Sequence, residues 1–167
     1  SATTNSVPPL CKSTWGQGYP YNGYCPRVGV NTCPVGCVAT AMAQIMYYYK
    51  HPERAQGGKI VYDTGNAKIG SNGYITEDFS TDEHIYAWDL MRDDVSMMNG
   101  TANIASRNAV AQLSYDCGVA TKMSYNTGGS GTTESEALYA FHKHFDYSVN
   151  TSLAYREMVS SQEEWNA

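Results

Sequence analysis

Charged residues are scarce in this sequence, and the basic ones are never adjacent. Of the 167 residues, 16% are charged, the formal net charge is −5, and no run of Lys or Arg is longer than one residue. Nucleic-acid binding normally requires a basic stripe that releases counterions from the phosphates. We therefore expect no nucleic-acid partner.

Long apolar segments are also lacking. No uninterrupted apolar run approaches the roughly 20 residues of a membrane-spanning helix, so no membrane span is expected. The first five residues (Ser-Ala-Thr-Thr-Asn) have neither the basic nor the apolar region of a secretory signal. The low charge, with 14 Tyr and 15 Gly, is nevertheless typical of a secreted protein, and a secreted protein with this start would already have been processed.

The cysteines lack the paired Cys-x-x-Cys pattern of a zinc site, so no metal is expected. Five are present: Cys11, Cys25, Cys33, Cys37 and Cys117. An odd count in an oxidising compartment leaves one thiol over, which is then open to reaction. We expect a disulfide between Cys11 and Cys25 or between Cys25 and Cys33, and a buried, reduced Cys117. The alternative is that all five are free and mostly buried.

No internal repeat or linker divides the sequence, so it fits one domain or a large piece of one. Residues 1–35 form an irregular arm rich in Pro, Gly and Tyr. Residues 37–50 predict a helix that is apolar on nearly every side, and therefore buried, and that ends before Pro52. The further elements expected are strands at 59–63 and 73–76, a helix at 82–95 after Thr81, a helix at 103–117 closed by Gly118, and a helix at 134–145 that starts with the capping-box pair Thr133 and Glu136.

The most informative stretch is the start of the first helix. Gly36 forms a turn that delivers Cys37 to the first helical position, and small residues follow it. The unpaired N–H groups and the dipole at a helix start favour an anion, and the thiolate is the nucleophilic form of cysteine. The same N–H groups can bind the oxyanion of a tetrahedral intermediate. The pattern therefore indicates a nucleophilic Cys37.

A second residue of this kind lies upstream. Gln17, in the segment Trp15-Gly16-Gln17, precedes Cys37 by 20 residues. Papain-like enzymes use a glutamine side-chain amide, placed before the nucleophile, as a donor to the oxyanion. We therefore expect Gln17 beside Cys37.

Several segments together resemble the streptopain family of papain-like cysteine peptidases. The helix start at residues 36–46 (Gly-Cys-Val-Ala-Thr-Ala-Met-Ala-Gln-Ile-Met) is similar to the nucleophile helix of that family, and residues 15–22 are similar to its oxyanion segment. Further similar stretches occur in the same order along the chain, at 116–119, 123–125, 128–131 and 137–147.

The resemblance implies an α+β fold of the papain-like, two-lobed type, with the mainly helical left lobe and part of the β-rich right lobe on this chain. It implies a secreted bacterial endopeptidase without a cofactor, made as a zymogen with a propeptide and acting on proteins or peptides. Cys37 would be the nucleophile and Gln17 part of the oxyanion hole. The loop with Gly129, Ser130 and Gly131 would line the substrate cleft.

The sequence departs from the family in its histidines. The catalytic His of papain-like enzymes follows the Cys by roughly 130–150 residues, which from Cys37 is about position 167–187. His51, His84, His142 and His144 lack the Gly-Gly-His-Ala setting of that base, and the last two, two apart on a helix, point in different directions and form no metal pair.

We therefore expect residues 1–167 to be a partial catalytic domain. The capping-box spacing at residues 161–164 predicts a helix that begins just before the last residue, Ala167. The catalytic His is expected on sequence beyond 167, or on a second chain of the same precursor cut near Ala167. Intact-mass analysis of active material would decide between one chain and two.

Two other functions stay open. Without the His, the chain could be a catalytically silent papain-like module for binding or inhibition. A transglutaminase-like or acetyltransferase enzyme would use the same thiol chemistry. The leading hypothesis is hydrolysis of peptide bonds through an acyl-thioester on Cys37.

Overall fold

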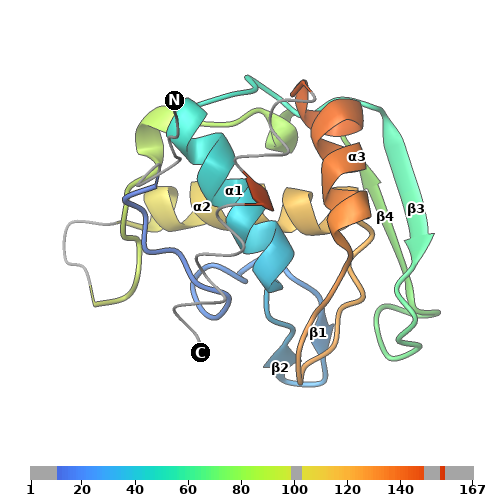
Figure 1. Cartoon of the computed structure of the whole chain (residues 1–167). Helices are drawn as coiled ribbons and strands as arrows, with labels where there is room; N and C mark the ends of the chain where they lie inside the picture. Colours follow the sequence, from blue (N-terminus) through green and yellow to red (C-terminus); the bar gives the residue numbers. More distant parts are fainter. Residues whose placement is uncertain (1–10, 99–102, 149–154, 157–167) are drawn as a thin grey trace.

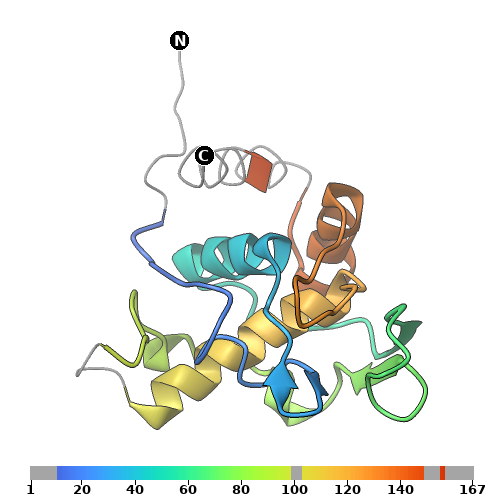
Figure 2. The same cartoon turned by 90° about the horizontal axis from the view of Figure 1, so that it is seen from below.

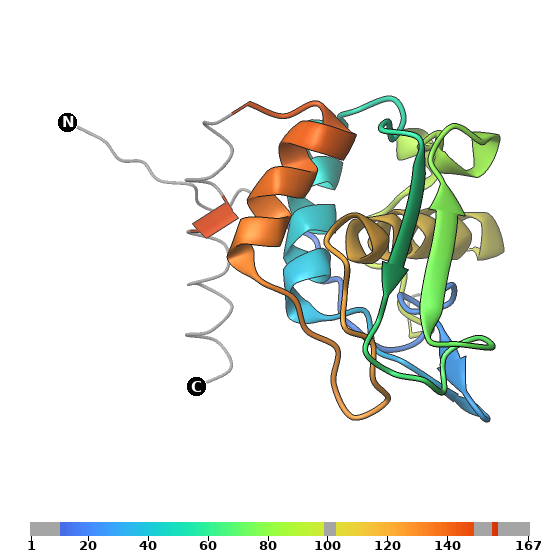
Figure 3. The same ribbon diagram turned by 90° about the vertical axis from the view of Figure 1, so that its right-hand side faces the viewer.

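The computed structural model describes residues 11–98, 103–148 and 155–156. Helix α1 crosses α2 and also contacts α3, and the ribbon of β3 and β4 lies beside α3 (Figures 1 and 2). Figure 3 brings that ribbon to the front, with α1 and α3 to its left. The elements are β1 (Arg27–Val28), β2 (Asn31–Thr32), α1 (Cys37–Tyr49), β3 (Lys59–Asp63), β4 (Tyr74–Asp78), the 3-10 turns η1 (Asp82–His84) and η2 (Trp88–Leu90), α2 (Ile104–Ala120) and α3 (Glu134–Phe145).

Helix α1 is the buried helix that the sequence predicts. Every residue from Ala39 to Met46 is buried, which fits small and apolar side chains on all sides of a helix between two others. The helix ends at Tyr49 because Lys50 adopts a left-handed conformation with φ 49° and donates its N–H back to the carbonyls of Met46 and Tyr47. The predicted helix, residues 37–50, therefore ends one residue late.

Helix α3 and the strands agree with the sequence patterns. The Thr133 hydroxyl accepts a hydrogen bond from the N–H of Glu136, as a cap at the start of α3 should. Strands β3 and β4 pair antiparallel, with Lys59 opposite Asp78 and Asp63 opposite Tyr74. The sequence predicts the second strand at 73–76, and it lies at Tyr74–Asp78.

Helix α2 runs further than the prediction of 103–117, because Gly118 lies inside the helix and does not close it. The Asn103 side chain caps its start by accepting from the N–H of Ser106. Gly118 is needed there for space, since a Cβ at this position would collide with the hydroxyl of the buried Tyr125. The glycine thus allows a close approach between α2 and the chain that follows it.

The helix predicted at 82–95 is wrong. Only the short turns η1 and η2 form, and between them the chain is extended: Ile85 forms a bridge with Arg54, and Tyr86 donates its N–H to the carbonyl of Glu53. Side chains two apart then point to the same side of the chain, so His84 and Tyr86 both face the core. This tertiary pairing overrides the local helix signal after Thr81.

The predicted disulfides are also absent, and all five cysteines are free. The three upstream thiols are reduced, and Cys25 and Cys33 belong to the same core cluster. The Cys11 thiol donates to the Gln44 carbonyl of α1 at 3.4 Å, while Cys25 and Cys33 are buried in the core. The alternative of five free thiols is the one that the structure shows, with Cys37 exposed.

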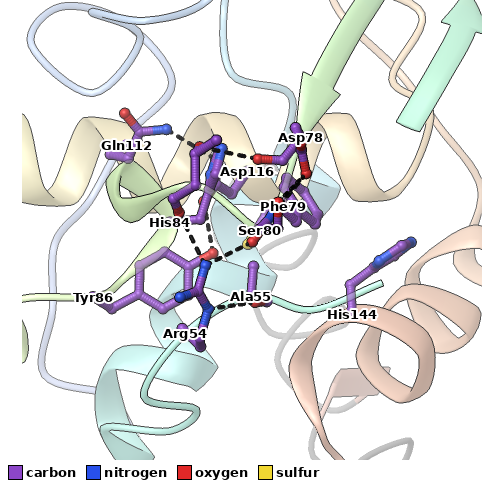
Figure 4. A network of polar contacts seen from close by, with 12 residues as sticks. Arg54, Ala55, Asp78, Phe79, Ser80, His84, Tyr86, Gln112, Asp116 and His144 are labelled. Carbon is purple, nitrogen blue, oxygen red and sulfur yellow. Dashed lines mark hydrogen bonds and ion pairs between the residues drawn. The ribbon is translucent and has the colours of Figure 1, made fainter. Parts of the chain in front are cut away.

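A buried polar network joins α2 to the segment after η1 (Figure 4). The carboxylate of Asp116 accepts from His84 Nδ1 at 2.8 Å, from the Tyr86 hydroxyl at 2.6 Å and from Gln112 Nε2 at 2.9 Å. Asp116 is fully buried and His84 is 1% exposed. Three donors on one carboxylate offset part of the penalty on its charge, although burial still raises the pKa of Asp116.

Asp116→Ala is expected to lower the free energy of unfolding by about 3–5 kcal/mol, because it leaves buried donors on His84 and Tyr86 without an acceptor. Urea denaturation of the variant, beside the exposed-site control Asp89→Ala, measures this loss. A loss of under about 1 kcal/mol, comparable to that of an ordinary surface substitution, would show that the network does not hold α2 in place.

The same network predicts a pH dependence of stability. Burial alone lowers the pKa of His84, but the hydrogen bond and charge of Asp116, with Glu77 and Glu83 nearby, outweigh it and raise the pKa above its usual value of about 6.5. A raised pKa means that protonated His84 stabilises the fold. This contribution is fully present below about pH 6 and is lost as the pH rises through the raised pKa.

The measurement is the free energy of unfolding between pH 5.5 and pH 9, compared between the natural protein and two variants. The free energy of unfolding should fall as the pH rises, and His84→Gln should remove the part of this fall that His84 causes. His51→Gln, at a partly exposed site, should show the same fall as the natural protein. An identical pH profile for His84→Gln and the natural protein would contradict the assignment.

Candidate active site

Cys37 is the first residue of α1, and its side chain is exposed. The preceding residue, Gly36, has φ 92° and ψ 137°, and no side chain caps the start of the helix. The first N–H groups of a helix have no partner within it, so those at Cys37 and Val38 remain available to a ligand. An exposed thiol therefore stands beside free hydrogen-bond donors, as the sequence predicted.

The turn at Gly36 admits only glycine. A positive φ near 90° is rarely adopted by residues with a side chain. A Cβ on Gly36 would also lie 2.8 Å from Met123 Cε and 3.2 Å from the Ser130 carbonyl oxygen. The turn before Cys37 is thus packed directly against the segment 123–131, which fixes where the thiol emerges.

Gln17 lies against the same turn. Its backbone carbonyl accepts from the N–H of Val35 at 3.0 Å, and its side-chain Oε1 accepts from the N–H of Gly36 at 3.1 Å. Since Oε1 is engaged, the Nε2 end of the amide remains as a donor, and it makes no hydrogen bond to any residue that the structure describes. The amide therefore stands one residue from Cys37.

Trp15 anchors the segment that carries Gln17. Its indole Nε1 donates to the Arg92 carbonyl at 2.9 Å, and its ring packs on Tyr47 of α1 with centroids 4.8 Å apart. Trp15 is 5% exposed. The Trp-x-Gln segment noted in the sequence therefore combines a buried anchor with an exposed amide.

The glycine-rich loop, residues 126–131, is the second segment that lies against the turn before Cys37. Ser124 and Gly131 exchange backbone hydrogen bonds of 2.9 and 3.2 Å, and the loop between them brings the Ser130 carbonyl against Gly36. Gly129 and Gly131 are exposed. In Figures 1 and 2 this loop and the segment after Gln17 lie on opposite sides of the start of α1.

The other four thiols are in environments that suppress reactivity. Burial, with the charge of Asp93, raises the pKa of Cys11 to about 11, and burial raises that of Cys25 to about 12. Burial likewise raises the pKa of Cys33 and of Cys117. These four remain protonated near neutral pH, which leaves Cys37 as the exposed thiol.

Three of the four histidines have partners away from Cys37, and the fourth, His142, is exposed. His84 binds Asp116, His144 Nδ1 pairs with the Gln56 carbonyl at 2.8 Å, and His51 contacts Asp146. His142 is exposed on α3 while His144 is buried, so the two do point apart. No hydrogen bond or ion pair among the described residues joins a His to Cys37. The expected catalytic His and the helix start at 161–164 lie outside the described residues.

One residue near the nucleophile gave no signal in the sequence. Tyr155 is 1% exposed, with its ring 6.0 Å from that of Phe141. Burial raises the pKa of its hydroxyl, and the nearby Cys37 adds to the rise. The next residue, Arg156, binds Glu134 of α3 at 2.7 Å.

Metal clusters and membrane spans are both lacking in the part of the chain that the structure describes. That part contains no group of three or more His, Cys, Asp or Glu residues placed to hold a metal ion. Within the same residues, every helix is too short or too polar to cross a bilayer.

Relatives in sequence are bacterial thiol proteases. The thiol protease/hemagglutinin PrtT of Porphyromonas gingivalis is 29% identical over 150 residues, which are 89% of this chain and 16% of that protein. Streptopain of Streptococcus pyogenes is 26% identical over 165 residues, 92% of this chain and 40% of that protein. The chain thus spans less than half the length of either relative.

Two solved structures from Prevotella intermedia are similar to the fold. A fragment of prointerpain A, with one cysteine replaced by alanine, matches with a TM-score of 0.70 and 35% identity over 81% of this chain and 42% of its own. The active interpain A cysteine protease matches with a TM-score of 0.68 and 31% identity, over 87% of this chain and 61% of its own. These matches confirm the α+β papain-like fold that the resemblance implied.

The family is settled by a match that extends over nearly the whole chain. Residues 15–167 fit the pattern of the Peptidase C10 family, which confirms the streptopain-type resemblance seen in the sequence. This chain belongs to the Peptidase C10 family.

Proposed function

We propose that this chain supplies the nucleophile and the oxyanion hole of a secreted bacterial cysteine endopeptidase. The observation that carries the proposal is the pair of hydrogen bonds that hold Gln17 to residues 35 and 36, because they set an amide donor beside the exposed thiol of Cys37. Family membership supports a peptidase that uses cysteine.

The chemistry follows from this placement. The Cys37 sulfur, as thiolate, forms a bond to the carbonyl carbon of a peptide, and the carbonyl oxygen becomes an oxyanion. The Gln17 amide and the Cys37 N–H donate to that oxygen. The C–N bond then breaks, and an imidazolium from sequence beyond residue 167 protonates the leaving amine. Water, deprotonated by the same imidazole, hydrolyses the acyl-thioester and restores the thiol.

The glycine-rich loop suits the acyl side of a substrate. Within the part of the chain that the structure describes, the Ser130 N–H and the Gly129 carbonyl make no backbone hydrogen bond. An extended peptide can pair with unpaired backbone groups as an added strand does. Gly129, Ser130 and Gly131 therefore form the wall on which the peptide backbone would lie.

The remaining features of the proposal rest on the relatives. A propeptide is supported by the similarity to prointerpain A, and the bacterial, extracellular setting by the bacterial thiol proteases among the relatives. We extend the proposal to a partial catalytic domain over residues 1–167, with the catalytic His on following sequence or on a second chain. A silent binding or inhibitory module is the competing function.

Covalent labelling separates these functions. In the full-length protein at pH 6, iodoacetamide or a peptidyl epoxide should modify Cys37 and leave the four buried or shielded thiols intact, as read by peptide mass spectrometry. Labelling should be faster than that of glutathione. Reactivity of Cys37 no greater than that of a free thiol would favour the silent module.

Peptide cleavage tests the two residue roles. Cys37→Ser should abolish turnover, and Gln17→Ala should lower kcat by about 10²–10³-fold, because one oxyanion donor is lost. Gln56→Ala, at an exposed site away from the nucleophile, is the matched control and should keep full activity. Full activity of Gln17→Ala would remove Gln17 from the oxyanion hole.

Gly36→Ala tests the geometry of the turn. The positive φ and the overlap with Met123 should cost roughly 1–3 kcal/mol of unfolding free energy and displace the thiol, which lowers the labelling rate of Cys37. The control is Gly18→Ala, where an added Cβ meets nothing within 4 Å. Equal stability and labelling for both variants would show that the turn does not position Cys37.

A further inference from the structure

A groove lies between the segment that follows Gln17 and the start of α2. The segment after Gln17 contributes Tyr19, Pro20, Gly23 and Tyr24, and Met97 also lines the groove. The first two turns of α2 contribute Ile104, Arg107, Asn108 and Ala111. Its volume is about 480 Å³, which is within the range of small-ligand pockets and can hold one or two large side chains.

The groove is formed before any ligand binds. The segment folds on itself, with the Asn22 N–H donating to the Gly18 carbonyl and the Gly23 N–H to the Pro20 carbonyl, each at 3.1 Å. Gly23 lies so close to α2 that a Cβ there would be 3.6 Å from the Ala111 Cβ. The wall is therefore packed on the helix and does not need to be ordered by a ligand.

The lining is mainly apolar, with Arg107 and Asn108 as its polar side chains, and it faces solvent. Tyr19 and Ile104 are each 73% exposed, Met97 is 57% exposed and Tyr24 is 45% exposed. The cation at the groove, Arg107, has its Nε and Nη2 directed to the Val95 and Ser96 carbonyls at 3.1 and 3.3 Å. Apolar side chains gathered around a hollow indicate a binding surface for an apolar group.

The position of the groove indicates which part of a peptide substrate would bind in it. Tyr19 follows Gln17 by two residues, so the wall of the groove continues directly from the proposed oxyanion hole, and two residues span at most about 7 Å. The glycine-rich loop lies on the opposite side of the start of α1 (Figure 2). A peptide whose acyl part lies on the 126–131 loop and whose carbonyl is at Cys37 therefore carries its leaving-group part toward the groove.

We propose that this groove binds a large apolar side chain of the substrate, on the leaving-group side and within the first three residues after the scissile bond. The inference rests on the proposed peptidase function and adds a substrate preference to it. Tyr19, Tyr24, Met97 and Ile104 are the residues that select this side chain.

The kinetic experiment uses the full-length mature protein and peptides that share their acyl side. One of the first three leaving-group residues is varied between Phe, Leu and Ser. The expected result is a kcat/KM about tenfold higher for Phe or Leu than for Ser at one position, as a filled apolar pocket provides. Ile104→Ser and Tyr24→Ser should reduce this ratio to about twofold. Val61→Ser, an exposed apolar site on β3, should leave it unchanged.

A binding experiment keeps the inference separate from catalysis. Hydrogen exchange of the Cys37→Ala protein is measured with two leaving-group-side hexapeptides, one with Phe and one with Ser. The Phe peptide should slow exchange in residues 19–24 and 104–111, and the Ser peptide should not. Protection of the Cys37→Ala protein by the Phe peptide, together with no peptide cleavage by the natural full-length protein, would refute the proposed hydrolysis and support the groove as a peptide site.

Three outcomes overturn the inference. The first is equal kcat/KM for Phe, Leu and Ser at all three positions, with turnover intact. The second is a preference that Ile104→Ser and Tyr24→Ser leave unchanged. The third is strong protection of residues 104–111 in the peptide-free protein that no peptide alters, because another part of the protein or a second copy would then occupy the groove.

Discussion

The hydrogen bonds between Gln17 and the backbone of residues 35 and 36 are the constraint on which the site depends. They fasten an otherwise irregular arm to the start of a helix that is buried over eight consecutive residues. Because α1 cannot shift in a close-packed core, its first residue has a fixed position, and so has the amide tied to it. These two hydrogen bonds thus join the proposed nucleophile and the proposed oxyanion donor, next to the segment that lines the groove.

Helix α2 positions the segment on the other side of Cys37 through a series of contacts. Gly118 lets Tyr125 approach the helix, and the Met123 N–H donates to the Gly118 carbonyl at 2.9 Å. The Met123 carbonyl in turn accepts from the Tyr62 hydroxyl of β3 at 2.8 Å. Met123 then packs on Gly36. The buried Asp116 network fixes α2 itself, so a carboxylate distant from the thiol supports the loop that flanks it.

Sequence patterns predicted the elements whose cause is local. Apolar residues on all sides of α1, the Thr133 cap of α3 and the alternation in β3 each reflect the chemistry of neighbouring residues. The helix at 82–95 failed because the pairing of Ile85 with Arg54 is non-local. The prediction that Gly118 closes α2 failed for a related reason. This glycine leaves space for the side chain of Tyr125, seven residues later. The prediction of disulfides failed because the spacing of cysteines along the sequence does not determine which thiols meet in the fold.

For the site, sequence supplied Cys37, Gln17 and the 129–131 loop, and the structure brings them to one turn. Gly36 and the buried Trp15 fix where these residues lie, while their roles stay predictions. Tyr155 and the groove beyond Tyr19 could not be predicted, since both depend on contacts between segments that are far apart in the sequence. The histidine of the proposed mechanism stays a prediction, because no described histidine makes a hydrogen bond or ion pair with Cys37.

The most direct test of this account is a crystal structure of the full-length protein with a peptide aldehyde bound to Cys37. The hemithioacetal oxygen stands where the oxyanion forms. The account predicts that this oxygen accepts hydrogen bonds from Gln17 Nε2 and from the Cys37 N–H, with Gln17 Oε1 still bound to the Gly36 N–H. An oxygen that points to solvent, with Gln17 turned away from Gly36, would contradict it.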